Sequence, residues 1–595
     1  MKFCKLAEVF FQISKESSRL NITYKLKDLY QNLSPEESQI VTYLALGNLG
    51  PDYKSNYQFN FAQKNLEKII SQILNQDLSE FKKLEKKAGD LSLVITSADW
   101  PYQDANLDII EVYNNLLELQ SITGTGSQEE KAGVLSNLFK KLDSLSASFI
   151  IRIILSTMRL GFSDMTIIDS LSFYLAGDKS LRSEIESKYN ICADLGLIAY
   201  QIKLHGQEGL KLINAQVSIP IRPAAAERAS SCLEIIDRMG DCIAQPKLDG
   251  FRLQIHIDNS HLGNPQIWFY SRNLQNMTGM FPDLSQALID KFCLHDLSNP
   301  LKIKNMIIEG EAIVYDELSE SFLPFQETVK RKRKHGIDQA AQDLPLRLFI
   351  FDILYFNDKL VLEKSYQERR EILLKIISDK IDLNSQERIF LIEEEYCKTA
   401  QELSDYFNKN ITQGLEGLVV KRPNTDYKPG KRNFNWIKLK RHQEGNLQDT
   451  IDAVVLGYYK GRGKRAAFEI GAFLVGVYNK ETDRFETTAK IGTGLKDNEW
   501  RELKEKCDKI KVNHKPFNVD CNQELEPDVW VNPEIVVIVL ADEITQSPMH
   551  TASKSDSSPG LALRFPRFIS YALDKNAQQA TTSQELRRLY DLQFD

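Results

Sequence analysis

The sequence has few cysteines, and none of them are closely spaced. Its 595 residues include eight cysteines, and the two nearest in sequence, Cys232 and Cys242, are ten positions apart. Zinc sites built from C-x-x-C pairs and the disulfide frameworks of small secreted domains both use much closer cysteines. We therefore expect the eight cysteines to be reduced side chains that help to fill the interior of the protein.

Long hydrophobic runs are also missing. No window of the sequence reaches the roughly 18 uncharged apolar residues that a membrane-spanning helix needs. The N-terminal segment MKFCKLAEVFFQISKESSRL interrupts its apolar residues with Lys and Glu, which predicts an amphipathic helix and not a signal peptide. These absences predict that the protein has no membrane partner. We expect a soluble, cytoplasmic protein, or a nuclear one if its source is eukaryotic.

Two common nucleotide-binding motifs are absent or incomplete. The P-loop pattern GxxxxGK[ST] does not occur, which excludes P-loop ATPases and kinases. The segment from Gly461 to Ala466 has the glycine spacing of a dinucleotide-binding loop, but a strand-like run follows it where that loop requires a helix. The sequence therefore does not predict a dinucleotide site at this loop.

A net positive charge is lacking as well, because the formal net charge is −7. Over the whole chain, this balance argues against a polyanionic partner. The basic residues are nevertheless clustered, and residues 421–441 hold eight of them against the single acid Asp426. The predicted phosphate contacts are Lys330, Arg331, Lys332, Arg333, Lys334, Arg462, Lys464 and Arg465.

The length predicts several domains, since 595 residues at 42% hydrophobic content exceed what one core usually supports. Helical periodicity dominates the first part of the chain, and Pro220 and Pro223 mark the point where strand patterns begin. After Arg441, short β-rich runs alternate with glycine and charged turns, as in a small barrel. We predict an all-α domain over 1–215, an α+β domain over 216–441 and a β-barrel domain over 442–595.

A lysine motif stands out in the middle domain. The segment QPKLDG, residues 245–250, precedes a predicted strand in which Leu253, Ile255 and Ile257 alternate toward the core. Lys247 is therefore expected in a turn before a strand. Such a lysine is not specific by itself, but further segments follow it in a fixed order. They are Tyr270-Ser271-Arg272-Asn273, Ile308-Glu309-Gly310-Glu311, residues 348–352 (LFIFD), residues 416–421 (EGLVVK) and residues 436–440 (WIKLK).

These six segments resemble the nucleotidyltransferase motifs of covalent nucleotidyl transferases. The best match is the archaeal and eukaryotic type of ATP-dependent DNA ligase. The resemblance spans nearly the whole chain, because GTGSQEEK and IIRIILSTMRLGF resemble that family's DNA-binding domain and residues 562–567 (ALRFPR) resemble its OB-fold domain. It implies an all-α DNA-binding domain, an α+β adenylation domain and a C-terminal OB fold, and it favours DNA over RNA as the substrate.

The resemblance also assigns roles to individual residues. Lys247 is the nucleophile that carries AMP. An ammonium ion cannot attack, so the pKa of Lys247 must fall through desolvation and through nearby positive charge from Arg252, Lys438 and bound Mg²⁺. The residues implied to bind the nucleotide are Gln245, Arg252, Arg272, Glu311, Phe351, Arg432 and Lys438, and the implied metal carboxylates are Glu311 and Glu416.

Some of these assignments compete with other interpretations. Phe351 lies in a run that is hydrophobic on both faces, so it fits a buried core as well as a ring that stacks on adenine. Gln245 departs from several relatives, which carry an acidic residue there. Lys438 shares one strand face with Trp436, opposite the face of Ile437.

Lys421 is not a predicted site residue. It differs in parity from Glu416, and a regular strand places residues of different parity on opposite faces.

The predicted reaction needs ATP as co-substrate and Mg²⁺ or Mn²⁺ to neutralise the leaving pyrophosphate. The predicted partner is nicked double-stranded DNA, bound by a monomer, with a sliding clamp as a further candidate partner and residues 441–446 as a hinge of the OB domain. One alternative is an RNA ligase or capping-type nucleotidyltransferase, which would not carry the large helical domain. Another is a catalytically inactive DNA clamp, against which the intact Lys247, Arg252 and Glu311 argue.

Overall fold

The computed structural model describes residues 1–595 apart from 55–58, 159, 261–263, 294–302, 317–320, 324–327, 329, 332–335, 378–386, 414, 441–449, 462–467, 556–557, 574 and 594–595. The predicted hinge, the predicted phosphate contacts Lys332, Arg333 and Lys334, and those at Arg462, Lys464 and Arg465 lie outside the described residues. The chain forms two compact units, one of Met1–Phe81 with Ile95–Arg441 and one of Lys82–Val94 with His442–Asp595.

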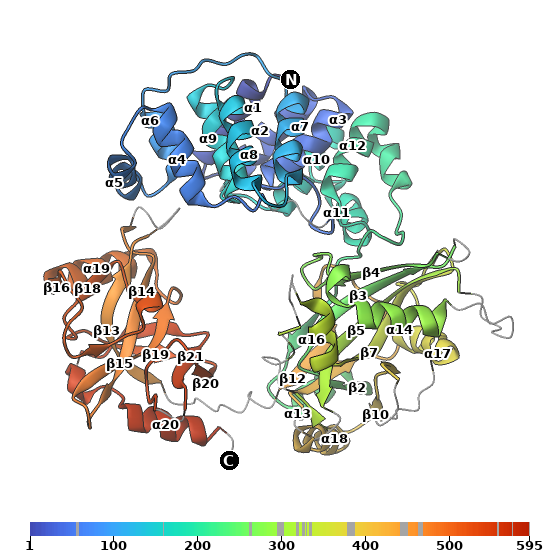
Figure 1. Ribbon diagram of the computed structural model, residues 1–595. Helices are drawn as coiled ribbons and strands as arrows, with labels where there is room; N and C mark the ends of the chain where they lie inside the picture. Colours follow the sequence, from blue (N-terminus) through green and yellow to red (C-terminus); the bar gives the residue numbers. More distant parts are fainter. Residues whose placement is uncertain are drawn as a thin grey trace. The chain divides into compact units, whose positions relative to one another are not determined.

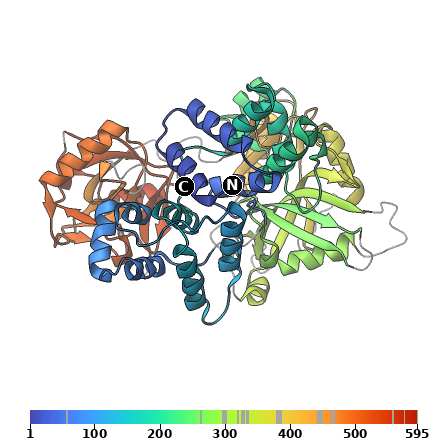
Figure 2. The same cartoon turned by 90° about the horizontal axis from the view of Figure 1, so that it is seen from above.

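The N-terminal part of the chain is helical, and no β-strand occurs in the described ranges up to residue 212 (Figures 1 and 2, blue to teal). Capping boxes begin two of its helices, at Ser34 with Glu37 and at Asp108 with Glu111. The helices are α1 (Phe3–Ser14), α2 (Arg19–Gln31), α3 (Pro35–Ala45), α4 (Gln63–Ile73), α5 (Leu78–Ala88), α6 (Leu91–Ser97), α7 (Ile109–Ser121), α8 (Ser127–Phe139), α9 (Ser144–Ile154), α10 (Asp164–Ala176), α11 (Arg182–Ile191), α12 (Leu195–His205) and the 3-10 helix η1 (Gly206–Leu212).

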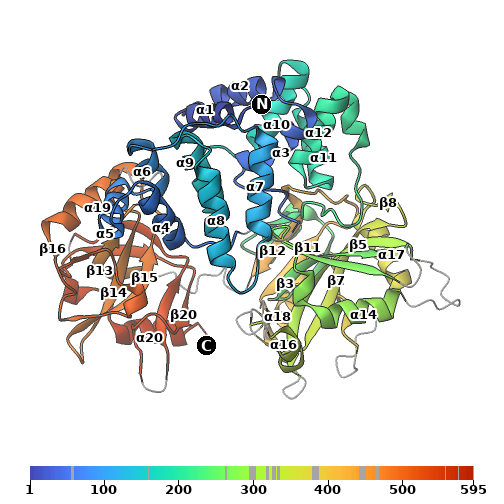
Figure 3. The same ribbon diagram turned by 45° about the horizontal axis from the view of Figure 1, so that its top comes forward.

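Several of these helices pack against one another; for example, α7 lies beside α8 (Figure 3). Nowhere in the described part of the chain is a helix long and apolar enough to cross a membrane. All eight cysteines are free, as expected.

Two β-sheets form the middle of the chain. The seven-stranded sheet has the order β4-β3-β5-β7-β8, with β6 on β5 and β9 on β7, and the five-stranded sheet has the order β1-β12-β11-β2-β10. The strands are β1 (Ala225–Arg228), β2 (Cys242–Lys247), β3 (Phe251–Asp258), β4 (Gln266–Ser271), β5 (Asn305–Asp316), β6 (Ser321–Phe322), β7 (Leu346–Phe356), β8 (Lys359–Leu360), β9 (Ile389–Leu391), β10 (Glu395–Cys397), β11 (Gly417–Lys421) and β12 (Arg432–Lys440). The helices of this region are α13 (Cys232–Met239), η2 (Thr278–Met280), α14 (Pro282–Phe292), α16 (Ile337–Asp343), α17 (Tyr366–Ile376) and α18 (Ala400–Thr412).

The two sheets form the inner layers between outer helices. Side chains of both sheets, among them Phe349, Phe351 and Trp436, share one apolar cluster. The other face of the seven-stranded sheet packs against α14 and α17, and the other face of the five-stranded sheet packs against α13 and α18 (Figure 1). Leu253, Ile255 and Ile257 are fully buried on the α14 side, which confirms the alternation predicted for this strand.

The C-terminal unit is built on a curved sheet. Strand β13 pairs with β14, β18 and β19, so the sheet bends round its central strand. Its elements are β13 (Ile451–Tyr459), β14 (Ala472–Asn479), β15 (Arg484–Ile491), α19 (Asp497–Lys509), β16 (Lys511–Val512), β17 (Val519–Asp520), η5 (Gln523–Leu525), β18 (Val529–Val531), β19 (Val536–Leu540), β20 (Glu543–Ser547), β21 (Gly560–Arg564), β22 (Arg567–Tyr571), η6 (Ala577–Gln579) and α20 (Ser583–Asp591).

Candidate active site

Lys247 is the last residue of β2, directly before the turn that leads into β3. Gly250 ends this turn against β5, where a Cβ atom would collide with the carbonyl oxygen of Ala312. Only a glycine therefore lets the turn lie this close to the neighbouring strand. The ammonium group of Lys247 contacts the carboxylate of Glu416. The turn thus fixes the backbone of Lys247, while its side chain extends toward Glu416, just before the neighbouring strand β11.

The register of the five-stranded sheet places several polar residues on one face. Gln245 of β2 lies opposite Val419 of β11, which in turn lies opposite Lys438 of β12. Residues directly opposite one another in an antiparallel pair point to the same side of the sheet. Gln245, Lys247 and Lys438 therefore share the face that looks toward the seven-stranded sheet. Ile437 is fully buried on the other face, which confirms the prediction for β12.

The structure corrects the expectation about Lys421. Gly417 and Lys421 face the same side as Lys247, because Gly417 pairs with Lys247 and Lys421 pairs with Ile243. Glu416 precedes the strand, and its backbone N–H donates to the carbonyl of Lys247. The parity argument assumed one regular strand, and it fails because Glu416 stands outside the strand at the edge of the site. Glu416 and Lys421 both border it.

The buried position of Lys421 explains how this cation is tolerated. Its Nζ atom donates to the carbonyl of Phe351 at 3.0 Å and lies 3.8 Å from Asp352. It also lies 4.4 Å from the ring centroid of Trp436 and 5.0 Å from that of Phe351. Burial lowers the pKa of Lys421 to about 7, against the opposing effect of Asp352.

The seven-stranded sheet contributes the opposite wall. Arg252 of β3 pairs directly with Glu311 of β5. The guanidinium of Arg252 donates to Glu309 at 2.9 and 3.0 Å and lies 5.5 Å from the ring centroid of Phe351. Phe351 is 9% exposed and meets Trp436 edge to face. Phe351 thus belongs to the core between the sheets and borders the site, so its predicted role in stacking stays a prediction.

Positive charge is concentrated around Lys438. Burial, together with the charge of neighbouring cations, lowers the pKa of Lys438 to about 8. These cations, in decreasing order of effect, are Arg228, Lys440, Arg272 and Lys247. Like charges held this close favour an anion among them, and phosphate groups satisfy several cations at once. This part of the site is therefore suited to a polyphosphate.

The carboxylates of Glu311 and Glu416 both lie near Lys247, but their pKa values are shifted in opposite directions. Burial raises the pKa of Glu311 to about 7, although Lys247 and Arg252 act to lower it. Burial also acts to raise the pKa of Glu416, but Lys247 and Lys440 outweigh it and hold that pKa below its ordinary value. Glu416 is thus ionised at neutral pH, whereas Glu311 titrates near neutrality.

The remaining predicted residues are exposed. Arg272 follows β4 and is one of the cations near Lys438, whereas Arg432 lies at the start of β12, six residues before Lys438. Sequence reasoning missed Arg228 and Lys440, although Lys440 has the same strand parity as Lys438. Arg228 had no such signal, because only the pairing of β1 with β12 brings it opposite Lys438.

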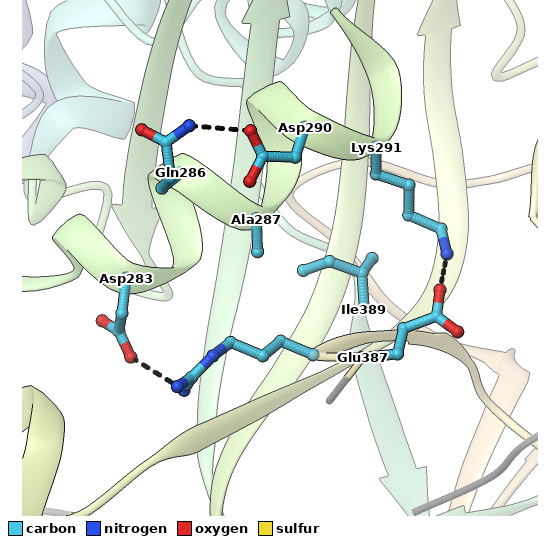
Figure 4. A pocket seen from close by; sticks show the side chains of 8 residues that line it. Asp283, Gln286, Ala287, Asp290, Lys291, Glu387 and Ile389 are labelled. Carbon is cyan, nitrogen blue, oxygen red and sulfur yellow. Dashed lines mark hydrogen bonds and ion pairs between the residues drawn. The ribbon is translucent and has the colours of Figure 1, made fainter. Parts of the chain in front are cut away.

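Another group of charged residues in the middle region lies away from this site. A pocket between α14 and β9, lined by Asp283, Gln286, Ala287, Asp290, Lys291, Glu387, Arg388 and Ile389, lies on the opposite face of the seven-stranded sheet (Figure 4). Lys291 pairs with Glu387 and Arg388 pairs with Asp283, while Asp290 accepts a hydrogen bond from Gln286. Arg331 is buried and bound to Asp283, which removes it from the predicted phosphate contacts, while Lys330 is exposed.

Comparisons with known families and proteins agree on one class of enzyme. Residues 223–440 match the family model described as ATP dependent DNA ligase domain, residues 2–172 match DNA ligase N terminus, and residues 466–575 match ATP dependent DNA ligase C terminal region. A probable DNA ligase of Dictyoglomus turgidum is 41% identical over 591 residues, covering 99% of this chain and 97% of that protein. A DNA ligase of Saccharolobus solfataricus is 35% identical over 610 residues, covering 100% and 98%. The solved structure named Pmar-Lig_PreS3 is similar in fold, with a TM-score of 0.54 at 14% identity over 95% of this chain and 98% of that chain.

Proposed function

The chain belongs to the family of ATP-dependent DNA ligases, and from that premise we propose that Lys247 is the residue that carries AMP. The enzyme uses ATP to join DNA ends. The observation that carries the proposal for Lys247 is its place at the edge of a cluster of cations, beside the ionised carboxylate of Glu416. Lys247 also ends β2 at a turn that Gly250 holds close to β5.

The proposed reaction has three steps. The uncharged Nζ atom of Lys247 attacks the α-phosphorus of ATP, the bond to pyrophosphate breaks, and the nitrogen loses a proton. A 5′-phosphate oxygen at the nick then attacks the same phosphorus, and the P–N bond breaks, which restores the lysine. Finally the 3′-hydroxyl attacks the 5′-phosphorus, and AMP leaves as the phosphodiester forms.

Different residues of the site contact different parts of ATP. We propose that Lys438, Arg272 and Arg432 hold the phosphates of ATP, that Arg252 and Glu311 hold its sugar, and that Phe351 and Gln245 border its base. Glu416 turns to other partners when ATP arrives, which frees the Nζ atom of Lys247 to attack the α-phosphorus.

The carboxylates fit a divalent metal. Glu311 and Glu416 offer hard oxygen ligands, and among the described residues no group of three or more His, Cys, Asp and Glu side chains is arranged to hold a metal. Mg²⁺ commonly binds through one or two carboxylates and takes its other ligands from phosphates and water. When bound, Mg²⁺ or Mn²⁺ supplies positive charge that neutralises the leaving pyrophosphate.

The test is transfer of label from ATP labelled on the α-phosphate, followed by a denaturing gel. We expect the protein to retain label and Lys247→Ala to retain none. Lys431→Ala, which changes an exposed lysine, is the control that should keep the label. Lys247→Ala should still seal a nick that is already adenylated, because that last step needs no lysine nucleophile. Label on Lys247→Ala would refute the assignment.

The domain division is also a proposal. We place the DNA-binding domain at 1–215, the adenylation domain at 216–441 and an OB fold at 442–595. The change from η1 to β1 supports the first boundary, and the curved sheet around β13 supports the OB fold. Limited proteolysis should cut first near these boundaries.

The partner is DNA, and nick sealing serves replication, repair and recombination alike. We propose that the enzyme acts as a monomer, because one chain carries a helical, a nucleotidyltransferase and a sheet domain. We propose a cytoplasmic location, since the reported relatives come from a bacterium and an archaeon. A sliding clamp stays a candidate partner, and co-elution of the enzyme with the clamp on gel filtration tests it.

A further inference from the structure

A chain of hydrogen bonds lies behind Gln245. The Nε2 atom of Gln245 donates to the hydroxyl of Tyr366 at 2.6 Å and to Oε2 of Glu394 at 3.1 Å. The hydroxyl of Tyr366 donates to the same Oε2 atom at 2.6 Å. Arg370 holds the other oxygen of Glu394, with its Nε atom at 3.3 Å. Gln245 and Tyr366 are both buried.

This arrangement determines which end of the Gln245 amide points inward. An amide nitrogen has two hydrogens, and both are used by Tyr366 and Glu394. In the flipped amide, Oε1 would lie against two groups, the hydroxyl of Tyr366 and the carboxylate of Glu394. Tyr366 has one hydroxyl proton and could donate it either to Oε1 or to the carboxylate. The other acceptor would then have no donor from Tyr366. Unpaired acceptors are costly when buried, so the observed orientation is favoured.

Tyr366 keeps the hydroxyl proton that it donates to Glu394. Burial, reinforced by the Glu394 carboxylate, raises the pKa of Tyr366 well above its ordinary value. The phenol therefore stays protonated throughout the neutral range and remains a donor to Glu394.

The amide oxygen is left for a ligand. No donor to Oε1 of Gln245 is found among the residues that the structure describes. Gln245 lies two positions before Lys247 on the same face of β2. Tyr366 and Phe351 flank the ammonium of Lys421, at 4.5 and 5.0 Å from their ring centroids. The Gln245 amide is thus at the end of the site bordered by Phe351.

We propose that Glu394 and Tyr366 are positioning residues that hold the Gln245 amide with its oxygen toward the nucleobase. An oxygen there accepts a hydrogen bond from a 6-amino purine and repels the oxygen of a 6-keto purine. Glu394 and Tyr366 thereby make the enzyme select ATP over ITP or GTP, without touching the base themselves. This inference rests on the proposed role of Lys247.

The experiment compares the transfer of α-phosphate label to the protein from three nucleotides. They are ATP, ITP and purine riboside triphosphate, whose base has no substituent at position 6. Glu394→Gln is the main variant, because a glutamine at 394 can donate to a flipped Gln245 amide. Tyr366→Phe is the second variant. Glu395→Gln is the matched control, since Glu395 is the neighbouring acid and is exposed.

We expect Glu394→Gln to lower the ratio of kcat/KM for ATP to that for ITP by at least about fivefold, the effect of one hydrogen bond. Labelling with purine riboside triphosphate should stay unchanged, because that base makes no bond to the amide. Tyr366→Phe should lower the ratio less, and Glu395→Gln should leave it unchanged.

Two results would overturn the inference while the proposed function stands: an unchanged ratio in both variants, or an equal loss with all three nucleotides, which indicates a packing role only. If the wild-type protein takes no label from any of them, the proposed function itself fails, and the inference fails with it.

Discussion

The carboxylate of Glu416 contacts the ammonium groups of both Lys247 and Lys440. Lys247 ends β2, Lys440 ends β12, and Glu416 precedes β11, which lies between these two strands. One carboxylate thus joins the ends of three neighbouring strands at the point where we place the reaction. The Nζ atom of Lys247 is engaged by this carboxylate, so the contact must be released before the lysine can attack.

Glu416→Gln should impair adenylation. The change removes an oxygen ligand proposed for the metal. Hydrogen bonds to charged groups contribute about 1.5–3 kcal/mol, so we expect a loss of roughly 10- to 100-fold in the rate. The Mg²⁺ concentration for half-maximal labelling should also rise. Exposed Glu363→Gln is the control, and equal labelling by both variants would contradict the role of Glu416.

Glu311→Gln should make the protein more stable at alkaline pH while lowering its activity. The pKa of Glu311 is raised to about 7 in the folded protein, against an ordinary value of 4.5. The folded state therefore binds more protons between these values, and the free energy of unfolding falls as the pH rises through this window. The loss is complete above about pH 7.

The measurement is thermal unfolding of the wild-type protein and Glu311→Gln at pH 5 and pH 8. The variant should gain stability relative to the wild type between these two values. A difference that is constant with pH would show that the carboxyl of Glu311 does not titrate there.

Arg432→Ala should weaken the use of ATP. Arg432 is exposed at the start of β12, and its proposed partner is the triphosphate. We expect KM for ATP in the labelling assay to rise about tenfold, as for the loss of one charged hydrogen bond. Neighbouring Lys431→Ala should change KM by less than about twofold. The opposite ranking of the two variants would transfer the role to Lys431.

Gly250→Ala should displace the turn that carries Lys247. The new methyl group would meet the backbone oxygen of Ala312, which cannot move without disturbing β5. Overpacking of this kind costs about 1–3 kcal/mol, so both the melting temperature and the rate of labelling should fall. Gly279→Ala is the control, because a Cβ there meets nothing within 4 Å. Full activity of Gly250→Ala would mean that the turn does not position the lysine.

Much of the site was predictable because strand alternation is a local property. The face shared by Trp436, Lys438 and Lys440 follows from a period of two residues, and the structure confirms it. The same rule failed for Lys421 when it was extended to Glu416, because the strand begins only at Gly417. Local patterns therefore predict faces within a strand but do not predict where the strand begins.

The sequence by itself determined the family, the order of the motifs and the helical, mixed and β-rich regions, because these depend on residue types at fixed local spacing. Tertiary structure alone decided that Arg228 lies opposite Lys438, that Tyr366 and Glu394 hold the amide of Gln245, and that Arg331 is buried against Asp283. These pairs join residues far apart in the chain. Their partners are fixed by sheet register and by packing between the layers, which no local pattern encodes.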